Sequence, residues 1–309
     1  MRHKINNTTL LIVFAALLVL TIVLFSGGND HRERSFDKQL LSFETEDVSA
    51  IKLYPKSMNG AYFTIENEDG QWTIVSDDKR YSANNSSVDA MVSALQTLDI
   101  KSLVANKKDR WEKYEVNDSL ASRVQLLSGS KVLADVYIGK FQFSQPQNMS
   151  TYVRLADEKE TYRANGFLSS TFNRNVNDLR DKTLVDDRLA NWTKMMFDYP
   201  ADSSFVLEKQ GEKWLLDGGM ADSASVVSYI NKVKQLNGRT IADVAENDVN
   251  KKYRLTIERK NLDAVVLTAG MAEDKRVVTS SENNDVWISD SDVLDKIFVS
   301  KNEFSVIKQ

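Results

Sequence analysis

The chain has 309 residues, of which 42% are hydrophobic and 27% are charged, enough for about two globular domains of roughly 150 residues each. Its 40 Lys and Arg are spread among 44 Asp and Glu and form no basic stripe, which argues against nucleic acid as a partner. The chain lacks cysteine and has only two histidines, His3 and His31, so thiol chemistry, structural zinc and His-based catalysis lose their usual residues. We expect no cofactor and no metal ion.

The N-terminal segment has the pattern of a membrane anchor. Residues 10–25 are apolar apart from Thr21, and Arg2 and Lys4 precede them. At a rise of 1.5 Å per residue these sixteen residues cover about 24 Å of helix, and their flanks extend this towards the roughly 30 Å of bilayer hydrocarbon. We therefore expect residues 8–27 to span the inner membrane, with residues 1–7 in the cytoplasm and the bulk of the chain in the periplasm.

A cleaved signal peptide is the alternative interpretation of this segment, because Ser26, Gly27 and Gly28 are small residues where a peptidase could cut. Under both interpretations, the rest of the chain is exported. We divide the sequence into a cytoplasmic tip and anchor (1–28), a polar juxtamembrane tether (29–46), a first repeat (47–184) and a second, shorter repeat (185–309).

Two segments far apart in the chain share one pattern. FTIENEDGQWTI (63–74) and FVLEKQGEKWLL (205–216) both have a Phe, an apolar and polar alternation, a polar turn with Gly, and a Trp nine residues after the Phe. Apolar residues at helical spacing follow each segment, over 88–98 and 226–236, with Asn85 or Ser86 expected to cap the first helix. The pattern predicts a β-hairpin followed by an amphipathic helix, twice, with Trp72 and Trp214 in the two cores.

The correspondence continues towards the end of each repeat. VQLLSGSKVLADVYIG, which ends at Gly139, matches LTIERKNLDAVVLTAG, which ends at Gly270, and Tyr162 is expected to stand opposite Trp287. Hairpin-length connections dominate both halves. The predicted fold class is therefore α+β: an N-terminal transmembrane helix followed by two tandem repeats of a largely antiparallel β-rich unit with one amphipathic helix each.

Candidate catalytic patterns are weak. The S-x-x-K pattern at Ser128 and Lys131 occurs five times in the chain, and this instance lies in a predicted hairpin turn. A second candidate is a group of carboxylates near the end of the first repeat: Asp178, Asp181, Asp186 and Asp187. These residues could form an acid–base pair or a Ca²⁺ site, but we favour a solvated linker. We do not expect an enzyme.

Two aromatic residues are the candidate partner-binding residues. Trp111 and Tyr114 lie in a polar segment between the first predicted amphipathic helix and the next strand. They could stack on a partner or a sugar, or they could tuck under the edge of the sheet. The sequence does not separate these alternatives.

Several short runs in the first repeat form a recognisable set: Tyr114-Glu115-Val116, Ile138-Gly139, Tyr152-Val153-Arg154, Thr161-Tyr162 and Leu179-Arg180-Asp181-Lys182-Thr183-Leu184. With these residues the chain resembles the bacterial family known as domain of unknown function 4340, over essentially its whole length and most clearly between Trp111 and Leu184. Many members have Gly where this chain has Glu115. The resemblance implies one N-terminal span followed by β-rich units, with no assigned catalytic residues. It also implies a genetic context, because such proteins are often encoded beside ABC-type exporter subunits similar to those of the gliding-motility machinery, as extracytoplasmic companions.

These observations favour a non-enzymatic, membrane-anchored extracytoplasmic accessory protein that binds an inner-membrane complex, such as an ABC-type permease. The alternative is an envelope enzyme or receptor acting on a polysaccharide or peptidoglycan fragment. An acidic cleft near Asp186 would favour the alternative, whereas a flat apolar patch would favour the accessory protein.

Overall fold

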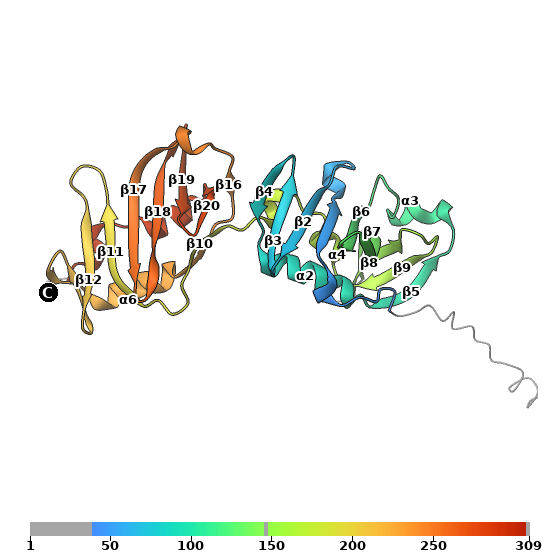
Figure 1. Cartoon of the computed structure of the whole chain (residues 1–309), viewed down its shortest axis with the longest axis horizontal. Helices are drawn as coiled ribbons and strands as arrows, with labels where there is room; N and C mark the ends of the chain where they lie inside the picture. The colour runs from blue at the N-terminus through green and yellow to red at the C-terminus, as the bar shows by residue number, and fades with distance from the viewer. Residues whose placement is uncertain (1–38, 145–147, 307–309) are drawn as a thin grey trace, which may run out of the picture.

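The computed structural model describes residues 39–144 and 148–306 (Figure 1). Two antiparallel nine-stranded sheets dominate it, and a separate two-stranded sheet packs into the core of the second half. Figure 1 shows the two halves side by side along the long axis, the first in blue to green and the second in yellow to red. The chain is β-rich with few helices, which is consistent with the predicted α+β class.

The first sheet has the strand order β4-β3-β2-β1-β6-β7-β8-β9-β5. Its strands are β1 (Ala50–Tyr54), β2 (Phe63–Glu68), β3 (Gln71–Ser76), β4 (Lys79–Ser82), β5 (Ile100–Ala105), β6 (Ser122–Ser128), β7 (Lys131–Ser144), β8 (Asn148–Leu155) and β9 (Thr161–Asn165). The α-helices of this half are α2 (Asn85–Gln96), α3 (Trp111–Tyr114), α4 (Leu168–Phe172) and α5 (Val176–Leu179). Short 3₁₀ helices are η1 (Thr45–Asp47), η2 (Lys56–Met58) and η3 (Lys108–Arg110).

The second sheet has the order β14-β13-β12-β11-β17-β18-β19-β20-β16. Its strands are β11 (Trp192–Asp198), β12 (Phe205–Gln210), β13 (Lys213–Leu216), β14 (Gly219–Met220), β16 (Ile241–Ala242), β17 (Asn250–Arg259), β18 (Leu262–Ala272), β19 (Lys275–Ser280) and β20 (Asn283–Ile288). Its helices are α6 (Ser223–Val233), η4 (Glu246–Asp248), α7 (Ser291–Ile297) and η5 (Lys301–Phe304). The small sheet pairs β10 (Thr183–Asp186) with β15 (Gln235–Asn237).

The two large sheets have the same connectivity. When β11 to β14 are matched to β1 to β4, β16 to β5, and β17 to β20 to β6 to β9, the two strand orders are identical. Helix α6 follows the fourth strand of the second sheet, β14, as α2 follows the fourth strand of the first sheet, β4. Trp72 on β3 and Trp214 on β13 are both buried in the hydrophobic core of their own half, so the prediction that both are core residues is confirmed.

Each amphipathic helix packs its apolar stripe against its sheet, because apolar positions three and four residues apart fall on one face. The buried residues of α2 are Val88, Met91, Val92 and Leu95, and those of α6 are Val226, Tyr229, Ile230 and Val233. The side chain of Asn84, one residue earlier than predicted, accepts a hydrogen bond from the Ser87 amide and caps α2. Asp222 caps α6 in the same way through the Ala224 amide.

One predicted correspondence differs by a single residue. Tyr162 pairs with Val153, and Ile288 pairs with Val278 at the same place in the second sheet. Ile288, rather than Trp287, therefore matches Tyr162. Neighbouring residues of a strand point to opposite faces, so Trp287 lies in a separate small cluster with Val249, Ala272 and Val277.

The described end of the predicted tether is not purely polar. Leu41 is buried in the first core, and Leu40 and Phe43 pack against that core. Residues 39–46 thus belong to the first half, because their apolar side chains complete its core. The predicted span at residues 8–27 lies outside the described residues. Within 39–144 and 148–306, no helix combines the length and apolar character needed to cross a bilayer.

Candidate functional site

The candidate site lies on the outer face of the first sheet, the face turned away from α2. Strand alternation directs Ile51 and Leu53 of β1 into the core, and with them Val124 of β6. Tyr54, next to Leu53, and its cross-strand partner Arg123, next to Val124, therefore point outward. In most antiparallel sheets this face is simply solvated. Here it carries stacked aromatic and cationic side chains.

These side chains form a row, which we call the cation–aromatic ladder. The Tyr62 and Tyr54 ring centroids are 4.9 Å apart. The Arg123 guanidinium carbon lies 5.5 Å from the Tyr54 centroid and 5.2 Å from that of Tyr137. The Arg154 guanidinium carbon lies 4.0 Å from the Tyr137 centroid and 3.8 Å from that of Trp111. In order, the ladder consists of Tyr62, Tyr54, Arg123, Tyr137, Arg154 and Trp111.

Arg154 is the buried centre of the ladder, with 2% of its surface exposed. Its Nε donates to the Val116 carbonyl at 3.0 Å, and one Nη donates to the carbonyls of Leu155 at 2.9 Å and Ala156 at 3.2 Å. Burial lowers the pKa of Arg154, although the neighbouring Tyr137 opposes this shift. Carbonyl oxygens and two ring faces thus hold a positive charge that has no hydrogen-bonded carboxylate among the described residues.

Arg123 is held more conventionally, by a forked ion pair. Its Nε and one Nη donate to the two oxygens of Asp135 at 2.8 and 2.6 Å. Gln125 also donates to Asp135, at 2.8 Å. The hydrogen bond to Asp135 raises the pKa of Arg123. Two-point bonding of this kind fixes the plane of the guanidinium and leaves its side chain preorganised between two rings.

The structure places both predicted partner-binding residues at the edge of this face. Trp111 closes the ladder, and its indole donates to the Lys159 carbonyl at 3.0 Å. The Tyr114 ring lies 4.6 Å from the ring of Tyr152, outside the ladder. Both side chains are half-buried against a small cluster that also contains Val116 and Tyr137. Their partner-binding role stays a prediction.

The turn after α3 keeps the shape that a glycine would favour. Glu115 adopts φ 56° and ψ 35°, in the left-handed region, although it is not glycine. Its carboxylate accepts a bond from Lys56 at 2.7 Å. Gly139 lies beside this turn, where an added Cβ would stand 2.4 Å from the Tyr114 carbonyl oxygen. Gly139 is therefore required by close backbone contact.

A cavity of about 540 Å³ opens beside the ladder; we call it the first hollow. Its wall includes Tyr54, Lys56, Asn59, Asp118, Arg123 and Tyr137. The Asp118 carboxylate faces the Tyr137 hydroxyl; burial and this hydrogen bond both raise the pKa of Tyr137. The first hollow thus combines aromatic, cationic, anionic and amide groups from β1, β6, β7 and the loops between them.

The second half has a cavity at the matching place, which we call the second hollow. In the first sheet, Arg123 stands directly across from Tyr54 on one neighbouring strand and Tyr137 on the other. In the second sheet, Arg254 stands across from Asp198 and Thr268 in the same way. Arg254, Asp198 and Thr268 all line the second hollow, whose volume is about 270 Å³. The arginine is retained, but an aspartate and a threonine replace the two tyrosines.

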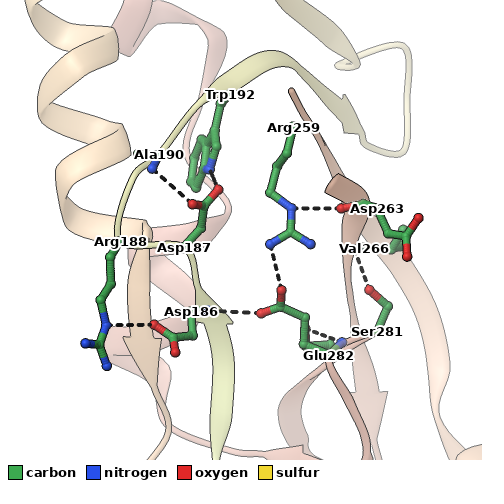
Figure 2. A network of polar contacts seen from close by, with 11 residues as sticks. Asp186, Asp187, Arg188, Ala190, Trp192, Arg259, Asp263, Val266, Ser281 and Glu282 are labelled. Atoms are coloured by element: carbon green, nitrogen blue, oxygen red, sulfur yellow. Dashed lines mark hydrogen bonds and ion pairs between the residues drawn. The ribbon is translucent and has the colours of Figure 1, made fainter. Parts of the chain in front are cut away.

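The carboxylates near the junction hold the backbone in place (Figure 2). Asp187 is buried and accepts bonds from the Trp192 indole at 2.8 Å and the Ala190 amide at 3.0 Å. The Asp186 amide donates to Glu282 at 3.0 Å, and Glu282 pairs with Arg259 at 2.8 Å. These contacts fix β10 to the second sheet, and Leu184 and Val185 of β10 pack into the second core.

The other two carboxylates of this group serve local turns. Asp178 forms a capping box with Asn175 at the start of α5, and Asp181 accepts bonds from the Thr183 amide and hydroxyl. The same stretch also connects the halves, because the Asp181 amide donates to the Ser82 carbonyl and its own carbonyl accepts from Asn283. Across 39–144 and 148–306 no group of three potential ligands is arranged to hold a metal ion.

The remaining sequence candidate, Ser128 with Lys131, lies where the sequence predicts it. The two residues pair directly across the turn between β6 and β7, and Gly129 of that turn has φ 57°. A hairpin turn lacks the helix start on which the S-x-x-K pattern depends for its chemistry.

The fold is that of an α+β protein built from two similar β-rich halves, because the two antiparallel sheets have the same strand order. The first sheet also has a polar and aromatic outer face. Residues 72–258, more than half of the chain, match the family described as domain of unknown function (DUF4340), and the chain belongs to that family. The match begins at Trp72 on β3 and ends at Glu258 on β17, so it includes the junction. No curated protein and no solved structure matches the chain.

Proposed function

We propose that the protein is a non-enzymatic accessory protein, anchored in the inner membrane by residues 8–27, whose exported halves bind a membrane complex. The proposed partner is an ABC-type permease or a related gliding-motility-like envelope complex. The sequence supports this proposal through the apolar segment at 10–25. The observation that carries it is an exposed apolar patch at one end of the first sheet.

The apolar patch consists of Phe141, Phe143, Met149 and Phe167. Phe143 is 59% exposed, and its cross-strand partner Met149 is 46% exposed. Phe167 is also 46% exposed, and its ring centroid lies 4.3 Å from that of Phe141. Contiguous apolar side chains of this size on a surface are typical of interaction sites, because water exposure disfavours them unless a partner covers them.

The occupant that we propose for this patch is an apolar surface of the permease, close to the membrane. An anchor confines the exported halves near that surface and raises their effective concentration there, towards the millimolar range for a short linker. A weak contact through a few aromatic side chains is then sufficient. This mechanism needs no reactive side chain, so Ser128→Ala should leave partner binding unchanged.

Co-purification from gently solubilised membranes tests this proposal. The full-length protein should recover an integral membrane complex, and the double variant Phe143→Asp with Met149→Asp should lose it. Leu262→Asp is the matched control, because Leu262 is an exposed apolar residue on the second sheet, away from the patch. Equal recovery by the double variant and the control would contradict the proposal.

A second candidate function is that of an envelope enzyme or receptor acting on a polysaccharide or peptidoglycan fragment. The observation that favours it is the first hollow, because its volume of about 540 Å³ falls within the roughly 300–1,000 Å³ typical of small-molecule sites. Its lining supports a receptor more than an enzyme, since Arg123 and Lys56 are already paired with carboxylates.

A further inference from the structure

We propose that the first hollow binds a neutral saccharide. This inference deepens the second candidate function and rests on it. It does not depend on the apolar patch or on a membrane partner. Three properties of the first hollow support it: the balance of its charges, the kinds of hydrogen-bonding groups on its wall, and its difference from the second hollow.

The charges of the first hollow disfavour an anionic ligand. Lys56 is paired with Glu115 at 2.7 Å, and Arg123 is paired with Asp135 at 2.6 Å. A third carboxylate, that of Asp118, lies on the wall. A phosphate or carboxylate would have to displace these partners or approach a site with no excess of positive charge. A neutral ligand has no such cost.

The hydrogen-bonding groups of the wall suit vicinal hydroxyls, which both donate and accept. Asp118 accepts, Asn59 does both, and the Arg123 Nη that does not contact Asp135 has no acceptor among residues 39–144 and 148–306. Because Asp135 and two rings fix Arg123, its free N–H groups are oriented before any ligand arrives.

An exposed ring at the end of the ladder supplies an apolar surface. Tyr62 is 51% exposed and packs beside Tyr54, which lines the first hollow. Sugar rings present C–H groups on one face and hydroxyls at their edges, so an aromatic ring next to polar groups matches both features. The position of Tyr62 is consistent with an extended saccharide that leaves the hollow across this ring.

The second hollow also has two tyrosines on its wall, Tyr199 and Tyr253, but it differs in size and in charge. Lys251, Lys252 and Arg254 face a single wall carboxylate, so it serves as an internal control with an excess of positive charge. Its volume is about half that of the first, and Asp198 and Thr268 replace Tyr54 and Tyr137. Arg254 is retained, so the arginine alone does not distinguish the two sites. Asp118 and Asp198 are both exposed carboxylates on the walls of their hollows, which makes them a matched pair for substitution.

The test measures binding to the full-length protein in a detergent without a sugar headgroup. The probes are the tetramer of N-acetylglucosamine, cellotetraose and inorganic phosphate. Binding of each probe is measured by titration calorimetry and ligand-observed NMR. At least one oligosaccharide should bind and phosphate should not. Loss of the charged acceptor in Asp118→Ala should weaken binding by about tenfold or more, and Asp198→Ala should leave it unchanged. Tyr62→Ala should weaken binding while far-UV circular dichroism stays unchanged.

Three results would overturn the proposal: neither oligosaccharide binds at millimolar concentration, phosphate alone binds, or Asp198→Ala weakens binding as much as Asp118→Ala. Each of these results leaves the co-purification experiment on the apolar patch unaffected, so failure of the saccharide site and failure of the membrane interaction are distinguishable.

Discussion

The buried Arg154 offers the sharpest test of how the outer face of the first sheet is held together. We expect Arg154→Ala to destabilise the first half strongly. The substitution leaves the Val116 carbonyl without its hydrogen-bond donor. Because Val116 is fully buried, the unsatisfied acceptor costs about 1–3 kcal/mol. The substitution also removes the stacking on Tyr137 and Trp111, each worth about 0.5–2 kcal/mol.

Part of this loss is offset because the variant no longer buries a charge. The net expectation is a loss of about 3 kcal/mol in the free energy of unfolding. Arg154→Met separates packing from polar contacts, because Met fills the space between the rings but donates no hydrogen bond. It should recover only part of the loss. Arg80→Ala is the control for a surface arginine: its pairs with Glu66 and Glu68 are exposed, so it should cost about 0–1 kcal/mol.

Urea unfolding followed by tryptophan fluorescence and circular dichroism measures these changes. The two halves have separate cores, so the transition of the first half should move while that of the second stays in place. If Arg154→Ala and Arg80→Ala cost the same, or if Arg154→Met equals the wild type, then the stacked guanidinium contributes nothing and our reasoning about the ladder is wrong.

Further predictions concern matched positions in the two halves and one buried tyrosine. Trp72→Ala and Trp214→Ala should each cost about 3–5 kcal/mol, because both rings are buried; near-native urea midpoints for both would show that the rings are dispensable. Gly139→Ala and Gly270→Ala should both lower the melting temperature, since a Cβ would stand 2.4 Å from the Tyr114 oxygen or 2.3 Å from the Asn250 oxygen. Gly219→Ala, whose Cβ would meet nothing closer than the Leu216 oxygen at 3.5 Å, tests whether a lost glycine alone explains the effect. Burial raises the pKa of Tyr229 well above its usual value. The contribution of Tyr229 to stability is therefore complete below the unfolded-state pKa of about 10 and is lost as the pH rises above that value. Tyr229→Phe should reduce this alkaline loss in a pH series of urea midpoints, and an unchanged alkaline slope would contradict the assignment.

Local patterns in the sequence predict much of the fold. The hairpins around Trp72 and Trp214 and the helices α2 and α6 follow from alternation and helical spacing, which depend only on near neighbours. The match of Trp287 to Tyr162 failed by one residue, because strand register depends on pairing with β19 and not on the strand alone.

The candidate site could be predicted only in part. Trp111 was found because an aromatic residue in a polar segment is conspicuous, but Tyr54, Arg123, Tyr137 and Arg154 were not. Their contacts join residues that are far apart in the chain and meet only when β1, β6, β7 and β8 are in register. A signal did exist for Tyr137, which occupies an outward position between the core residues Val136 and Ile138 on a predicted strand.

The central claim is that the protein works by holding a binding surface next to a membrane partner, and site-specific photo-crosslinking in intact cells tests it most directly. A photoreactive residue is placed at position 143, in the apolar patch, or at position 262 as the control. The account predicts an adduct between position 143 of the full-length protein and an integral membrane protein. It also predicts no such adduct from position 262, or from a released chain of residues 29–309. If the released chain gives the same adduct, tethering is not required. If position 143 gives no adduct while position 262 does, the apolar patch is not the contact surface. Either result contradicts the central claim.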